Sequence, residues 1–134
     1  MQVKDIAEQC GVSPDTVRYY TRIGLLKPSQ DPVNRYRLYS QKDHSTLRFA
    51  VRARQLGFSL DDIQTICSTA GDGASPCPTV RELMRENLQR TEAMFQEIKR
   101  LRDRMRQAVA QWESMPNCDP TGEQICSLIE NWDK

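Results

Sequence analysis

The chain has 134 residues, with 38% apolar and 28% charged side chains and a formal net charge of +1. This length suits one compact domain with an extension, and because no apolar run reaches about 18 residues we expect no membrane-spanning helix. The N-terminus carries acidic residues without the apolar stretch of a secretory signal, which favours a cytoplasmic protein whose thiols stay reduced.

The near-neutral total hides an uneven distribution of charge. Residues 1–70 contain 10 basic and 7 acidic side chains, whereas residues 71–134 contain 9 basic and 11 acidic ones. A mildly basic first half is compatible with nucleic-acid binding, but an ordinary solvated surface produces the same bias. The charge distribution alone therefore leaves both interpretations open.

Two short helices joined by a tight turn are predicted at the N-terminus. Residues 3–10 space apolar side chains at helical intervals and precede Gly11, a typical helix stop. Ser13 and Pro14 then begin a second helix as its N-cap and first helical residue, and that helix is expected to end at Gly24. Two helices with so short a connection form a helix-turn-helix unit.

A Ser-x-x-Asp pattern, an approximate capping box, occurs twice in the following segment. At residues 40–43 it begins a predicted third helix that ends at Gly57, and at residues 59–62 it begins a fourth that ends near Cys67. A stretch rich in Gly, Ala and Ser follows and marks a hinge. The predicted organisation is a domain at 1–70, a hinge at 71–78, a long helix at 79–115 and a terminal segment at 116–134.

The helix predicted for residues 79–115 lacks Gly and Pro and carries a stripe of side chains at alternating steps of three and four. Its apolar members are Val80, Met84, Met94, Ile98, Leu101, Met105 and Trp112. At 1.5 Å per residue the helix is about 50 Å long, too long for the preceding domain to cover. We expect it to pair with a second copy of the chain, with packing inside its own chain as the alternative. The polar Asn87 either sets the register of the pair or lies at a solvent-tolerant end of the seam.

Candidate DNA-binding residues lie on the second helix, on a hairpin or wing formed by extended stretches at 25–28 and 36–39, and on the third helix. They are Thr16, Arg18, Tyr19, Arg22, Arg35, Tyr36, Arg37, Arg52 and Arg54. An arginine donates two hydrogen bonds to O6 and N7 of guanine, and contacts with phosphates add salt-dependent affinity. The alternative is that the arginines are ordinary surface charges and that the tyrosines belong to the core.

Three motifs in this order resemble the MerR family of transcriptional regulators. They are VKDIAEQCGVSPDTVRYYTRIGLL at 3–26, NRYRLY at 34–39 and RQLGFSLDDI at 54–63. The resemblance implies a mainly α-helical fold, with a winged helix-turn-helix DNA-binding domain, a long antiparallel coiled-coil dimerisation helix and a short C-terminal metal loop. It also implies a homodimer that binds double-stranded promoter DNA and distorts its spacer, so that RNA polymerase engages both promoter elements.

Three of the five cysteines are candidate metal ligands. Cys118 and Cys126 bracket a loop in a terminal segment too short to enclose an organic molecule, and Cys77 precedes the long helix. In an antiparallel pair the start of one long helix lies beside the end of the other, so Cys77 of one subunit meets the loop of its partner. Three thiolates suit a soft ion such as Hg(II), Cd(II), Pb(II), Zn(II) or Cu(I). Burial as apolar filler is the alternative for these three and the favoured interpretation for Cys10 and Cys67.

The resemblance narrows the choice of ion only in part. Cys77 matches a cysteine that heads the dimerisation helix in members for divalent ions, which disfavours Cu(I), whereas the spacing of Cys118 and Cys126 is like that of the copper-type loop. Trp112 stands near the usual place of the first loop cysteine. We expect Hg(II), Cd(II) or Pb(II) rather than Zn(II). Covalent sensing of oxidants or electrophiles by the same thiols is the second hypothesis, and no nucleophile–base pair or phosphate-binding loop suggests an enzyme.

Overall fold

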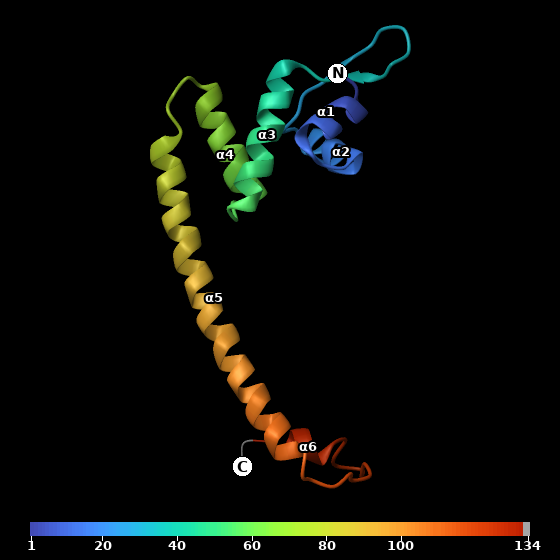
Figure 1. The fold of residues 1–134 in the computed structure, drawn as a ribbon, viewed down its shortest axis with the longest axis vertical. Coiled ribbons are helices and arrows are strands. Elements are labelled where there is room, and N and C mark those ends of the chain that lie inside the picture. Colours follow the sequence, from blue (N-terminus) through green and yellow to red (C-terminus); the bar gives the residue numbers. More distant parts are fainter. Residues whose placement is uncertain (133–134) are drawn as a thin grey trace. The chain divides into compact units, whose positions relative to one another are not determined.

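The computed structural model describes residues 1–132, which contain six helices and one two-stranded sheet (Figure 1). The helices are α1 (Val3–Cys10), α2 (Pro14–Arg22), α3 (Gln41–Gln55), α4 (Leu60–Gly71), α5 (Cys77–Trp112) and α6 (Ser127–Glu130). The strands β1 (Ser29–Gln30) and β2 (Arg37–Leu38) pair antiparallel, with Ser29 opposite Leu38. The chain forms two compact units, the first at Met1–Asn87 and the second from Leu88 onward. The predicted helical fold with a helix-turn-helix and one long helix is confirmed.

Hydrogen bonds at the helix ends explain where these helices begin and stop. Gly11 after α1 adopts a left-handed backbone with φ of 69°, which a residue without a Cβ adopts at little cost. The Ser13 hydroxyl accepts from the Thr16 amide at 3.1 Å and caps α2. Reciprocal Ser–Asp capping boxes at residues 40–43 and 59–62 begin α3 and α4. These predicted helix starts are therefore confirmed.

The predicted hinge is shorter than expected because the helices on both sides extend into it. α4 continues past Cys67 to Gly71, since the left-handed glycine that follows the helix is Gly73. α5 begins at Cys77, whose amide donates to the Ser75 hydroxyl at 3.3 Å. The prediction that α4 ends near Cys67 was wrong. The chain between the two helices is thus a short turn.

Helices α1 to α4 enclose one apolar core, and α1 and α2 lie side by side at the blue end of the ribbon (Figure 1). Its largest fully buried side chains are Ile6, Val17, Leu26, Leu47 and Ile63. Each helix contributes the side chains of one face, as the helical spacing of apolar residues predicts. The faces of these helices that point away from the core are exposed to solvent and carry mostly polar side chains.

Two polar contacts attach the wing to this core. The buried carboxylate of Asp43 accepts from the Lys27 amide at 3.0 Å, just before β1. On the other side, the Tyr39 and Thr21 hydroxyls are hydrogen-bonded at 2.8 Å. The strands begin later than predicted: residues 25–28 are not a strand. The wing is therefore held at its base rather than by a long sheet.

The first turns of α5 belong to the first unit. Val80, Leu83 and Met84 pack against its core and are half-buried. The Asn87 side-chain amide donates to a carboxylate oxygen of Asp62 in α4 at 3.3 Å. Val80 and Met84, which the sequence assigns to the dimer seam, thus contact their own chain. Asn87 likewise ties α5 to α4, a role that neither sequence interpretation included.

The second unit combines the rest of α5 with a loop and α6. Ala108 is buried, and the Trp112 and Trp132 rings meet edge to face with their centroids 6.3 Å apart. Trp112, predicted for the seam, therefore packs within its own chain. Other seam residues remain exposed in the single chain: Met94 at 62%, Ile98 at 63% and Met105 at 57%. Along residues 1–132, none of the helices has the length and apolarity that a bilayer crossing requires.

Candidate nucleic-acid interface and thiol loop

α2 presents a charged face to solvent because its apolar side chains point into the core. Val17 and Tyr20 are buried, whereas Arg18, Tyr19 and Arg22 are exposed. The Arg22 guanidinium lies over the Tyr19 ring, 5.4 Å from its centroid, so the two side chains form one cationic and aromatic surface. Three of the predicted contact residues on this helix are accessible to a large ligand.

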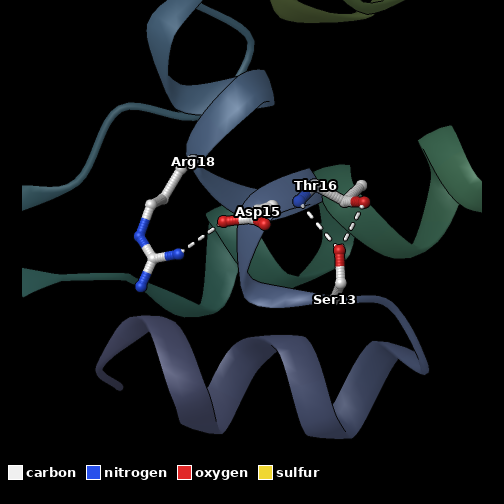
Figure 2. A network of polar contacts seen from close by, with 4 residues as sticks. All are labelled: Ser13, Asp15, Thr16 and Arg18. Atoms are coloured by element: carbon white, nitrogen blue, oxygen red, sulfur yellow. Dashed lines mark hydrogen bonds and ion pairs between the residues drawn. The ribbon is translucent and has the colours of Figure 1, made fainter.

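The first turn of α2 carries a polar network (Figure 2). Asp15 Oδ1 accepts from Arg18 Nη1 at 2.8 Å, and the Ser13 and Thr16 hydroxyls lie 3.0 Å apart. Thr16 is half-buried beside the cap, so Arg18 is the more accessible of the two predicted residues. Asp15 was not predicted as a site residue. Its place three positions before Arg18 is the signal that could have found it.

Side-chain turns build the tip of the wing. The Asp31 carboxylate accepts from the Val33 amide at 2.8 Å, and Asn34 Oδ1 accepts from the Tyr36 amide at 3.0 Å. Arg35 between them has a left-handed backbone with φ of 62°, unusual for a residue with a long side chain. The predicted wing residues Arg35, Tyr36 and Arg37 are all exposed.

The two arginines predicted at the end of α3 differ in their contacts. Arg52 and Arg54 are both exposed. Arg54 Nη1 donates to the Phe58 carbonyl at 2.9 Å, which ties the C-terminus of α3 to the turn before α4. Arg54 therefore stabilises the fold locally in addition to carrying charge, which its position in the sequence did not indicate.

All five cysteines are free thiols. Cys77 and Cys118 are exposed, and Cys126 is half-buried. Cys77 begins α5 in the first unit, whereas the other two belong to the loop of the second. Within residues 1–132, no three His, Cys, Asp or Glu side chains gather into a group that could hold a metal ion.

The loop that bears Cys118 and Cys126 contains a tight turn at residues 121–124, closed by the Thr121 amide, which donates to the Gln124 carbonyl at 2.8 Å. The Thr121 hydroxyl accepts from the amides of the two residues after Gly122, at 3.1 and 3.0 Å. Glu130 Oε2 accepts from the Ile125 and Cys126 amides, both at 2.9 Å. A carboxylate of α6 thus holds the backbone at Cys126.

The remaining two cysteines pack at the core of the first unit. Cys10 and Cys67 are half-buried against it. Burial raises the pKa of the Cys10 thiol, an effect that the charge of Arg48 opposes, and burial also raises the pKa of the Cys67 thiol. A raised pKa lowers the thiolate fraction near neutral pH, so both thiols are poorer ligands and nucleophiles.

A helix-turn-helix with an exposed second helix, followed by an arginine-bearing hairpin, defines a winged helix-turn-helix DNA-binding protein. Comparison with known families agrees. The family model described as MerR HTH family regulatory protein matches residues 1–70, and the one described as MerR, DNA binding matches residues 45–108. The chain belongs to the MerR family of transcriptional regulators.

Individual relatives are also regulatory proteins. The chain is 35% identical over 103 residues to heavy metal-dependent transcription regulator 2 of Rhizobium meliloti (strain 1021), covering 75% of this chain and 70% of that one. It is 30% identical over 108 residues to the mercuric resistance operon regulatory protein of Bacillus cereus, covering 73% and 82%. The crystal structure of the transcription regulator PbrR691 from Ralstonia metallidurans CH34 in complex with lead(II) shares the fold, with a TM-score of 0.75 and 19% identity over 98% of both chains.

Proposed function

We propose that the protein is a homodimeric activator of transcription that binds promoter DNA and senses a soft heavy-metal ion through three cysteines. The observation that carries this proposal is that a winged helix-turn-helix and three free thiols occur in one chain. The thiols belong to Cys77, at the start of α5, and to Cys118 and Cys126, in the loop that follows α5. The names of the heavy metal-dependent and mercuric resistance relatives support a metal as the effector.

Dimerisation is supported by the apolar stripe on the second unit. Phe95 and Val109 extend the exposed seam residues, at 60% and 56% exposure. Complete burial of one such side chain contributes about 1.5–3 kcal/mol, so two stripes that cover each other are strongly stabilised. An apolar stripe of this length on a regulator is typical of a protein interface.

The metal site requires both subunits. α5 has 36 residues and separates Cys77 from the loop, so a head-to-tail pair brings Cys77 of one subunit to the loop of the other. Thiolate sulfur is the ligand type preferred by soft ions such as Hg(II), Cd(II) and Pb(II), and three thiolates without a histidine favour these ions over Zn(II). The cysteine at the head of α5, Cys77, argues against Cu(I). The exposed Cys77 and Cys118 are accessible to an entering ion.

The DNA contacts are proposed for the exposed arginines of α2 and the wing. In this proposal Arg18 contacts bases. Arg35 and Arg37 bind the phosphate backbone of DNA, because a hairpin next to the recognition helix lies against the phosphates. An ion held between the subunits then selects the conformation in which the dimer distorts the promoter spacer and RNA polymerase engages both promoter elements.

A metal titration tests this function. Reduced dimer is titrated with Hg(II), Cd(II), Pb(II), Zn(II) and Cu(I), following thiolate-to-metal absorption and transcription from a responsive promoter. Saturation at one ion per subunit is expected, and Cys118→Ser or Cys126→Ser abolishes the response without loss of DNA binding. Cys67→Ser is the matched control and leaves the response unchanged. Metal-driven transcription by the triple variant of Cys77, Cys118 and Cys126 contradicts the proposal.

Covalent sensing of oxidants or electrophiles is the second candidate, because Cys77 and Cys118 are exposed thiols. It predicts a mass increase on these residues and activated transcription after treatment with an oxidant or aldehyde in the absence of metal. Activation by metal without such a mass change excludes it.

A further inference from the structure

The first turn of α2 carries an acidic residue on the face that we propose meets DNA. The Asp15 and Arg18 side chains are 93% and 55% exposed, and they form an ion pair at 2.8 Å (Figure 2). An exposed pair of this kind contributes little to folding stability. The ion pair therefore gives little reason for the carboxylate at this position, and its remaining contribution to stability is a favourable interaction with the positive end of α2.

General attraction to DNA gives no reason either. A carboxylate beside phosphates is repelled, and a helix N-terminus without it is a favourable site for a phosphate. Ser13 already caps α2, so the Asp15 carboxylate is not needed for that purpose. If this surface bound only the phosphate backbone of DNA, the Asp15 carboxylate would lower the affinity for DNA.

Base recognition gives the carboxylate a role in addition to its interaction with the helix dipole. In the major groove, cytosine presents the N4 amino group as a donor, and acidic side chains accept from it. Adenine also presents an amino group, but its N7 acceptor lies next to it and repels a carboxylate. Guanine and thymine present acceptors at the corresponding place. A carboxylate in this groove therefore favours cytosine.

The geometry of the pair leaves both side chains able to bind bases. Among residues 1–132, Arg18 donates only through Nη1, so Nε and Nη2 remain for O6 and N7 of guanine. Asp15 accepts through Oδ1, which leaves Oδ2 for an amino group. The ion pair also restricts the rotamers of Arg18 before DNA is met, which lowers the entropy lost on binding.

We propose that Asp15 is a specificity-determining residue, which accepts from N4 of a cytosine while it orients Arg18 toward a neighbouring guanine. This inference rests on the proposed function, because it requires α2 to enter the major groove with its N-terminal residues at the base edges.

The test is selection of binding sites from a randomised duplex library by the full-length wild-type protein and by Asp15→Asn. Asparagine prefers adenine, to which it donates and from which it accepts. We expect the preference at one position to change from cytosine to adenine, by about 5- to 150-fold in relative affinity. Arg18→Gln should remove the guanine preference at the neighbouring position. Circular dichroism of both variants checks that they are folded.

Asp61→Asn is the matched control, because Asp61 is an exposed acidic residue in the first turn of α4 and its substitution changes the charge equally. If Asp15→Asn and the control strengthen binding to all sequences alike and leave the selected site unchanged, Asp15 acts only through its charge and the inference is wrong. If the wild-type protein selects no site, the proposed function itself fails. The two failures are thereby distinguished.

Discussion

Replacing Asp43 with alanine is expected to lower the free energy of unfolding by about 3 kcal/mol. Asp43 is 6% exposed and accepts from the Lys27 amide at 3.0 Å and from the Ser40 amide and hydroxyl at 3.0 and 3.1 Å. A hydrogen bond to a charged group contributes about 1.5–3 kcal/mol, and its loss leaves the amide of Lys27 without its acceptor. The three bonds share one carboxylate and water replaces part of them, so the expected loss is well below their sum.

Urea denaturation followed by circular dichroism measures this loss. The protein concentration is held constant, because the proposed dimerisation would make the apparent stability depend on that concentration. Asp5→Ala is the matched control: Asp5 accepts from the Gln2 amide at 3.0 Å in an exposed capping box, so its loss costs about 1 kcal/mol. Equal losses of stability in the two variants would show that burial adds nothing to the contribution of the Asp43 carboxylate.

Two further predictions concern the second unit and the thiols. Ile98→Asp should raise the dissociation constant of the proposed dimer at least about 100-fold, because each subunit then buries a carboxylate in an apolar seam. Light scattering over a range of protein concentrations measures this dissociation constant. The control Gln96→Asp, on the opposite face of the helix, should leave the dimer intact. In a timed alkylation at pH 8 read by peptide mass, Cys118 should react well before Cys67, because Cys118 is exposed whereas burial raises the pKa of the Cys67 thiol. Raising the pH should accelerate the reaction of Cys67. Equal rates for the two thiols would show that Cys67 is accessible.

The local features of the first unit could be predicted because they depend on neighbours in the sequence. The cap at Ser13, the Ser–Asp boxes at 40–43 and 59–62, and the left-handed Gly11 each involve residues at most four positions apart. The same holds for the exposed face of α2, which follows from the buried positions of Val17 and Tyr20.

The partners of several side chains could not be predicted in this way. Asn87 follows the periodicity of the seam, but its hydrogen-bond partner Asp62 lies 25 positions earlier. Trp112 also follows that periodicity and packs on Trp132. Periodicity shows which face of a helix is apolar, but not which surface covers it.

The helix-turn-helix, the long helix, the family resemblance and the candidate thiols could all be predicted from the amino-acid sequence, because helix caps, apolar spacing and motifs involve residues close together along the chain. The packing of Val80 and Met84 on their own core and the attachment of the wing by Asp43 became visible only in the folded chain. These contacts depend on how distant segments meet, and the energy of such packing is set by the shapes and burial of both partners rather than by either segment alone.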